Sequence, residues 1–250
     1  MPRAELPPLE LHPVERLPEE WTAVMAAWGE ARFRASQVFL WIHKRGVLDA
    51  HRMKNLPRRL RDRLAAEGLD GSLGEVSHRH RSDDETQKLL VRLHDGKEVE
   101  TVLIPQLRAL EDDEQEGVEV LPGKVPGGRI TQCISSQVGC AMGCVFCASG
   151  IAGLKRHLSA AEIVAQVLVG RAALSEGQRI RNVVFMGMGE PLHNYPAVAR
   201  ALKLLTHEDG IHLSTRRITV STSGLVPEIG RLGEEFGGRV QLAISLHQTD

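Results

Sequence analysis

The 250-residue sequence lacks any hydrophobic run of about 18 residues, the length that a membrane-spanning helix requires. Its N-terminus, MPRAELPPLELHPVE, has no apolar segment of the kind that a secretory signal contains. The chain also has little net charge, with 31 Lys and Arg against 32 Asp and Glu, which argues against a wholly basic nucleic-acid-binding protein. These absences predict a soluble, cytoplasmic protein without a membrane partner, large enough for one sizeable core or for a small domain plus part of a larger one.

The sequence also lacks the dispersed cysteines of a disulfide framework, in which each bridge closes a longer loop. All of its cysteines fall within 15 residues of the chain. Clustered thiols in a cytoplasmic chain indicate metal or redox chemistry. The four residues are Cys133, Cys140, Cys144 and Cys147.

Residues 1–87 are expected to form a small helical module. Residues 19–28 show a short helical pattern, and FRASQVFLWIHKRGVLDAHRMKNLPRRLRDRLAAEG predicts two or three further short helices, the last opened by Pro57. From Arg32 to Arg63 there are ten Lys or Arg and only two acidic residues, Asp49 and Asp62. The module is therefore basic although the whole chain is neutral, and a merely solvated helix face is the competing interpretation.

Residues 88–129 are expected to connect this module to the rest of the chain. The runs KLLVRL and EVETVLIP are typical of two strands, and the Asp95-Gly96 pair between them predicts a hairpin turn. The acidic run EDDEQEGVE and the Gly/Pro-rich stretch LPGKVPGG follow, and both predict a surface loop.

From residue 130 onward, strand-like and helix-like patterns alternate. This alternation predicts an α/β fold with a parallel sheet whose functional residues lie at the carboxyl ends of the strands. Four strands are too few to close a barrel, so we expect residues 130–250 to be a partial (β/α) barrel that is incomplete at its C-terminus. The expected strands cover residues 130–135, 182–186, 217–222 and 240–246, and the expected helices cover residues 159–174, 197–205 and 227–236.

The stretch CAMGCVFC follows the first of these strands and carries three cysteines with the spacing C-x3-C-x2-C. Three thiolates hold a 4Fe-4S cluster through three of its irons, so that the fourth iron is free to bind a small molecule. A structural zinc site that uses all four cysteines is the alternative. We disfavour zinc because such sites draw on two separated pairs of ligands, whereas these thiols are compressed into one segment.

Three further polar motifs follow the other expected strands. MGMGEP begins at Met186, and its glycines allow a ligand to approach the backbone while Glu190 accepts hydrogen bonds from an ammonium group. STSG begins at Ser221 and SLH at Ser245, and their hydroxyl and imidazole groups suit the polar parts of a cofactor that lies across the sheet. Each motif alone is also compatible with an ordinary strand end or helix cap.

Together, QCISSQVGCAMGCVFCASG, ETVLIP, NVVFMGMGEPL, RRITVSTSGLVPEI and LAISLH resemble the radical S-adenosylmethionine (SAM) methyltransferases that modify adenine carbon 2 in RNA, the RlmN/Cfr family. The resemblance extends from FRASQVFLWI to the end of the chain. It implies that a 4Fe-4S cluster is held by Cys140, Cys144 and Cys147. It also implies that SAM is bound by Gly189, Glu190, Ser221, Ser245, Leu246 and His247.

The resemblance implies two catalytic residues, Glu100 as the proton acceptor and Cys133 as the thiol that releases a covalent RNA-enzyme intermediate by forming a disulfide. From the residues alone, an exposed strand carboxylate and a buried small side chain are the simpler interpretations of these two positions. In the family's reaction, one SAM methylates a cysteine near the C-terminus, and a second is reductively cleaved to a 5′-deoxyadenosyl radical. That radical activates the methyl group for addition to the ring.

The resemblance further implies 23S ribosomal RNA and transfer RNA as substrates, an electron donor such as flavodoxin or ferredoxin, and a monomer. The basic N-terminal module suits such an RNA. Two features depart from the family: no cysteine follows Cys147, and the stretch between Pro105 and Cys133 is unusually long. We therefore expect a fragment that cannot complete the reaction.

Several alternatives stay open at this stage. One is methylation of adenine carbon 8, although the SLH triplet favours carbon 2. Another is a radical-SAM enzyme that acts on a substrate other than RNA. The third is a catalytically incomplete iron-sulfur or zinc protein that only binds RNA. The sequence also does not decide between ribosomal RNA, transfer RNA or both.

Overall fold

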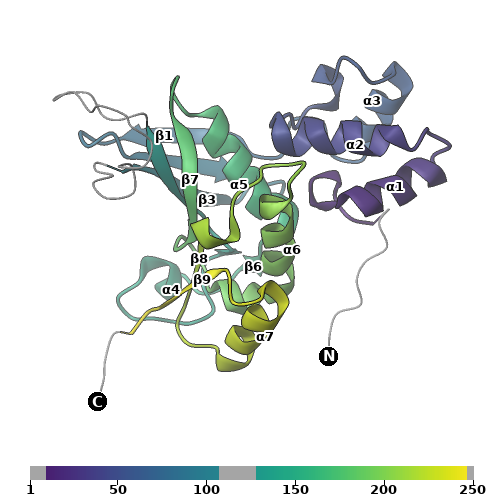
Figure 1. The fold of residues 1–250 in the computed structure, drawn as a ribbon. Helices are drawn as coiled ribbons and strands as arrows, with labels where there is room; N and C mark the ends of the chain where they lie inside the picture. Colours follow the sequence, from purple (N-terminus) through teal and green to yellow (C-terminus); the bar gives the residue numbers. More distant parts are fainter. Residues whose placement is uncertain (1–9, 107–127, 247–250) are drawn as a thin grey trace, which may run out of the picture.

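The computed structural model describes residues 10–106 and 128–246, and Figure 1 shows their arrangement. The expected SAM ligand His247 and most of the expected acidic loop lie outside these residues. Within the described ranges, no helix is both long and apolar enough to cross a lipid bilayer.

A seven-stranded mixed sheet organises the molecule, with the strand order β1-β2-β3-β4-β7-β8-β9. Strands β1 to β4 pair antiparallel, and β4, β7, β8 and β9 pair parallel. The predicted parallel sheet is therefore confirmed. The strands are β1 (Glu75–Arg81), β2 (Gln87–Arg92), β3 (Glu98–Pro105), β4 (Arg129–Cys133), β7 (Arg179–Phe185), β8 (Ile218–Thr222) and β9 (Gln241–Ile244).

The predicted hairpin is present as β2 and β3, but it is not a separate link between two units. Val102 of β3 pairs with Cys133 of β4, so the hairpin extends the parallel sheet directly. Strand β1 was not expected. Its sequence EVSHRHR lacks the apolar alternation that indicates a strand, because β1 lies at the sheet edge and is largely exposed on both faces.

The two faces of the sheet differ in what covers them. Side chains alternate between the faces along each strand, and those on one face are buried under α5 and α6. Side chains on the opposite face, such as Glu100, Cys133 and Ser221, are only partly buried. We call this second side the open face. The helices of this region are α4 (Ala148–Ile151), α5 (Ala160–Ala172), α6 (Tyr195–Thr206) and α7 (Val226–Phe236).

The helices expected in residues 1–87 are present as α1 (Pro18–Ala27), α2 (Phe33–Phe39) with a following π-helical turn (Leu40–Lys44), and α3 (Arg58–Ala66). The same range also contains β1, which belongs to the sheet, so the helical module is shorter than its expected bounds. The module shares one continuous apolar core with the sheet and its helices. Arg200 of α6 donates to the Glu20 carboxylate of α1 at 2.9 Å, which adds a polar tie between the two parts. The module is therefore fixed relative to the sheet (Figure 1).

Candidate functional site

The segment after β4 and the MGMGEP turn after β7 lie against each other at the carboxyl ends of the parallel strands. Ser135 Oγ accepts a hydrogen bond from the Met188 amide at 2.9 Å and donates one to the Glu100 carbonyl at 2.7 Å. A Cβ atom on Gly187 would lie 2.7 Å from Ser135 Oγ, and one on Gly189 would lie 2.8 Å from the Gln137 nitrogen. Glycine is needed at both positions, and at Gly189 also because its φ is +105°.

Glu190 ends this turn with a carboxylate that is 4% exposed. Its oxygens accept hydrogen bonds from the Leu192 amide at 3.1 Å and from the amide and hydroxyl of Ser223 at 2.9 and 3.1 Å. Glu190 therefore joins the ends of β7 and β8. A carboxylate has about four acceptor positions, so little capacity is left for the ammonium group of SAM. Its role as a SAM ligand stays a prediction.

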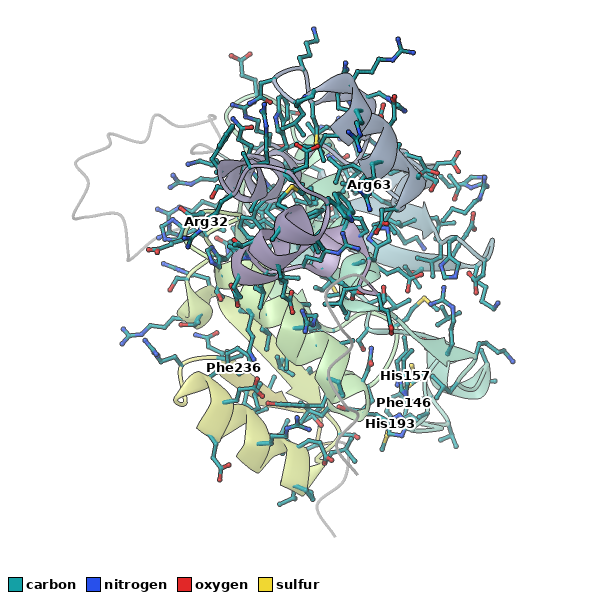
Figure 2. The ribbon with its side chains drawn as sticks, turned by 90° about the vertical axis from the view of Figure 1, so that its right-hand side faces the viewer. Arg32, Arg63, Phe146, His157, His193 and Phe236 are labelled. Atoms are coloured by element: carbon teal, nitrogen blue, oxygen red, sulfur yellow. The ribbon has the colours of Figure 1, made fainter. Side chains whose placement is uncertain are left out.

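Gln137 holds the same turn, and no sequence pattern indicated this role. Its Oε1 accepts from the Glu190 amide at 2.9 Å, while its Nε2 lies 3.0 Å from His157 Nδ1 and 3.2 Å from His193 Nδ1. Figure 2 shows the two imidazoles beside each other, with ring centroids 5.2 Å apart. Glutamine has no distinctive chemistry, so only its distant partners reveal that it positions this site.

A two-stranded ladder closes the base of the cysteine loop, formed by β5 (Gln137–Val138) and β6 (Arg156–His157). Inside the loop, the Cys147 amide donates to the Cys144 carbonyl at 3.1 Å. A Cβ atom on Gly150 would lie 2.8 Å from the Cys144 amide nitrogen, so α4 can approach the loop this closely only because that position is glycine. The loop is therefore a compact unit at the ends of the strands.

The thiols of the loop influence one another. Burial raises the pKa of the Cys140 thiol, and the neighbouring thiols of Cys144 and Cys147 raise it further. The pKa of Cys133 is raised by burial and, to a smaller extent, by the negative charge of Glu100. Cys133 therefore interacts with a carboxylate of the open face rather than with the loop thiols. Three thiols are therefore grouped in the loop, and the fourth belongs to a different environment.

This donor set fits an iron-sulfur cluster held by three cysteines. A structural zinc site closed by four cysteines would need Cys133 to join the loop thiols. Among the described residues, no three Cys, His, Asp or Glu side chains are already arranged to hold a metal ion. A cluster would therefore have to draw the three loop thiolates together. All three are free and only partly buried, so the loop offers them without breaking a disulfide.

The sheet register brings the two predicted catalytic residues to the open face. Cys133 lies opposite Val102 of β3, and Glu100 lies two residues along from Val102 on the same face. The Glu100 carboxylate forms an ion pair with Lys88 of β2 at 3.2 Å. The structure therefore places a carboxylate and a thiol close to each other, beside the cysteine loop.

The predicted SAM ligands on β8 and β9 share this face. Ser221 lies opposite Ala243, and Ser245 follows two residues later, so that the two hydroxyl oxygens are 3.3 Å apart. The Ser245 amide donates to the Thr222 carbonyl at 2.9 Å, which fixes the position of the strand end. Leu246 is exposed.

Comparisons with known proteins agree with this arrangement. Residues 17–68 match the family described as the ribosomal RNA large subunit methyltransferase N-terminal domain, and residues 134–250 match the radical SAM superfamily. A crystal structure of a radical SAM methyltransferase from Sphaerobacter thermophilus is similar, with a TM-score of 0.79 and 41% identity. That alignment covers 94% of this chain and 63% of the crystallised chain.

Curated relatives carry the name dual-specificity RNA methyltransferase RlmN, some of them with the qualifier probable. The protein from Sorangium cellulosum is 62% identical over 96% of this chain and 65% of its own length. The protein named as probable, from Akkermansia muciniphila, is 40% identical over 97% of this chain and 63% of its own length. The chain thus spans a little under two thirds of the length of these relatives.

Proposed function

Because this chain belongs to the RlmN family of the radical SAM superfamily, we propose that it acts in the methylation of adenine carbon 2 in 23S ribosomal RNA and in transfer RNA. The observation that carries this proposal is the open face. Glu100 and Cys133, from the neighbouring strands β3 and β4, and the hydroxyls of Ser221 and Ser245, from the ends of β8 and β9, face the same side of the sheet, and this shared face supports the proposal.

We assign the cluster and SAM to separate sets of residues. We assign the cluster to Cys140, Cys144 and Cys147, and a bound cluster would supply the electron that SAM cleavage requires. SAM is assigned to the ends of β7, β8 and β9. The residues for SAM are Gly189, Glu190, Ser221, Ser245, Leu246 and His247.

Glu100 and Cys133 are assigned to the last steps on the RNA base. Burial and the negative charge of Glu100 raise the pKa of Cys133, so this thiol keeps its proton at neutral pH. When Glu100 takes up a proton from the adenine ring, its negative charge disappears and the pKa of Cys133 falls. The thiolate needed to release the RNA therefore becomes easier to form once the base has been deprotonated.

The RNA itself is assigned to the basic module, residues 1–87. Besides the buried Arg16, which stacks on Trp21, three of its arginine side chains stack on aromatic rings. The guanidinium-to-centroid distances are 4.7 Å for Arg34 on Phe33, 4.1 Å for Arg45 on Trp41 and 4.2 Å for Arg63 on Trp28. Stacking orients a guanidinium while leaving its N–H groups available to phosphates.

The proposal also includes a cytoplasmic monomer and an external electron donor such as flavodoxin or ferredoxin. Val145 and Phe146 of the cysteine loop are 87% and 64% exposed, which leaves the loop accessible to such a donor.

Disruption of the gene in its own organism tests the whole proposal. RNA from the disrupted strain should lose 2-methyladenosine in a nucleoside digest of 23S ribosomal RNA and of transfer RNA, and the intact gene should restore it. Unchanged 2-methyladenosine in both RNAs would contradict the proposal. Loss of 8-methyladenosine instead would move the reaction to carbon 8.

A further inference from the structure

A second concave site lies at the opposite ends of the parallel strands from the cysteine loop. It is a cavity of about 660 Å³ between the first residues of β7, the segment before β8 and the start of β9. This volume lies within the range of ligand-binding sites, about 300–1,000 Å³. Its lining includes the arginines Arg179, Arg181, Arg216 and Arg217, and we call it the arginine cavity.

The charges around the arginine cavity are of one sign. Among the described residues that line it, none is acidic, while four are arginines and one is His212. Arg179, Arg216 and Arg217 make no ion pair with any described residue. Grouped positive charges repel one another, and in a chain with a net charge of −1 nothing in the composition forces them together. An anion bound between them would relieve this repulsion.

The segment that carries two of the arginines is held in a fixed shape. His212 adopts a φ of +59°, a conformation that is uncommon for residues other than glycine. Hydrogen bonds on both sides maintain it, from the Leu213 amide to the Leu205 carbonyl at 2.9 Å and from the Arg217 amide to the Ser214 carbonyl at 2.8 Å. The arginines therefore extend from a backbone that is already ordered before any ligand binds.

A neighbouring cavity of about 370 Å³ shares Arg179, Ile180, Ile211 and Leu213 with the arginine cavity. It extends to Arg171 of α5, whose guanidinium donates to the carbonyls of the module residues His43 and Lys44, both at 3.0 Å. The neighbouring cavity thus leads from the arginine cavity to a residue that contacts the basic N-terminal module.

We propose that the arginine cavity binds phosphate groups of the RNA backbone, as a second contact that continues from the basic module around the amino ends of the strands. This inference rests on the proposed function, because it takes RNA as the substrate. Guanidinium groups suit phosphate because their N–H groups form paired hydrogen bonds with two of its oxygens. Such contacts position an RNA without reading its sequence.

The test measures the binding of an unmodified transfer RNA transcript to the chain by fluorescence anisotropy between 50 and 300 mM KCl, a range of roughly a factor of six over which phosphate contacts dominate the salt dependence. Each phosphate contact contributes roughly 0.7–0.9 to the slope of log affinity against log salt concentration. The double variant Arg216→Ala/Arg217→Ala should reduce the slope by about 1.5. Arg216→Lys/Arg217→Lys should restore most of it, since lysine keeps the charge.

Arg79→Ala/Arg81→Ala on the exposed strand β1 is the matched control, because it removes the same charge at the far edge of the sheet. It should leave the slope unchanged. Thermal unfolding of each variant identifies any loss of folding. A slope that stays the same in the Arg216/Arg217 variant, while the unchanged chain binds RNA, would overturn this inference and leave the proposed function standing.

Two other outcomes are also decisive. If the unchanged chain does not bind RNA at all, the proposed function fails and this inference fails with it. If Arg216 and Arg217 are required for binding inorganic pyrophosphate, measured by calorimetry, but not for the RNA salt slope, the cavity is a site for a small anion and the RNA assignment is wrong.

Discussion

The pKa of Cys133 is raised mainly by burial, and a neighbouring residue across the sheet raises it further. Its thiol is shielded by burial, and the carboxylate of Glu100 adds a negative charge that further raises its pKa. Glu100→Gln removes this charge without changing the shape of the side chain. We therefore expect the pKa of Cys133 to fall in this variant, because the thiolate is no longer opposed by a like charge.

The measurement is the rate of iodoacetamide alkylation of Cys133 as a function of pH, followed by mass spectrometry of its peptide so that the three loop cysteines do not interfere. The midpoint should move to lower pH in Glu100→Gln. Glu98→Gln is the matched control, since Glu98 lies on the same face of β3 but farther from Cys133. Equal midpoints in the unchanged chain and in Glu100→Gln would show that the two groups do not interact.

The three thiols of the cysteine loop differ from Cys133 in a way that iron binding should reveal. Anaerobic reconstitution with iron and sulfide should give a brown protein with about four irons per chain. Cys144→Ala should lose the iron, because only two loop thiolates remain. Cys133→Ala should keep it, since Cys133 lies on β4 with Glu100 as its neighbour. Stoichiometric zinc with no iron uptake, or loss of metal in Cys133→Ala, would contradict this assignment.

Arg156 ties three elements together at the base of the cysteine loop. From β6, its guanidinium donates to both oxygens of Asp95 in the β2–β3 turn, at 2.9 and 3.1 Å, and to both oxygens of Glu162 in α5, each at 2.8 Å. These bonds, with that of Lys97, hold the pKa of Asp95 below its ordinary value. Burial would raise the pKa of Glu162, but the bonds from Arg156 and from the Ser159 amide leave it lowered.

We expect Arg156→Ala to destabilise the fold. The Glu162 carboxylate is only 3% exposed, and this variant removes its main counter-charge. Loss of one partner of a buried pair costs about 3–5 kcal/mol, and we expect about 2–3 kcal/mol here because solvent reaches Arg156. The midpoint of thermal unfolding should fall by roughly 5–10 °C. Lys155→Ala is the matched control, since this neighbouring lysine is exposed.

The loss of stability in Arg156→Ala should be smaller at low pH than at neutral pH. Both carboxyl groups have lowered pKa values in the folded chain, so their stabilising contribution is complete above their unfolded pKa of about 4 and is lost as the pH falls through the folded values. The difference in free energy of unfolding between the unchanged chain and Arg156→Ala should therefore become smaller as the pH falls from 7 to 3. A stability difference that stays constant over this pH range would contradict a stabilising role for the ion pairs of Arg156.

Elements with strong local signals could be predicted from the sequence, and those that depend on pairing could not. The capping box of α5 is visible as Ser159 and Glu162, and it forms with bonds of 3.2 and 3.0 Å. Strand β1 carries no periodic pattern because it is exposed. Arg181 and Arg216 lie far apart in the chain and line one cavity only because β7 and β8 pair in parallel.

The same limit applies to the candidate site. The cysteine spacing and the strand-end motifs are local, so they could be recognised in the sequence. The hydrogen bonds of Gln137 and the bond from the Ser223 amide to the Glu190 carboxylate join separate segments, so they could not. The spacing already disfavoured the zinc alternative, because the thiols are compressed into one segment. The structure weakens that alternative, because it places Cys133 beside Glu100 on the open face.

The molecule as a whole joins its basic module and its candidate active site into one body. A single apolar core extends from Val14 to Val240 and includes residues of the module, the helices and the sheet. Figure 2 shows Arg32 and Arg63 on the module, away from His157 and His193 beside the cysteine loop. An RNA held by the module would therefore meet the open face in a fixed orientation, without a hinge between binding and chemistry.

We expect these 250 residues to support the cleavage of SAM but not the methylation of RNA. The sequence contains all the residues assigned to SAM and the cluster, so the reconstituted chain should bind SAM and, with dithionite, release 5′-deoxyadenosine. Cys147→Ala should not bind the cluster or SAM, and it should release no 5′-deoxyadenosine. The family's reaction also needs a methyl-carrying cysteine, and every cysteine of this sequence lies between Cys133 and Cys147, in positions already assigned. We therefore expect chromatography of digested RNA to show no 2-methyladenosine after incubation with this chain, and its appearance would require a different route for the methyl group.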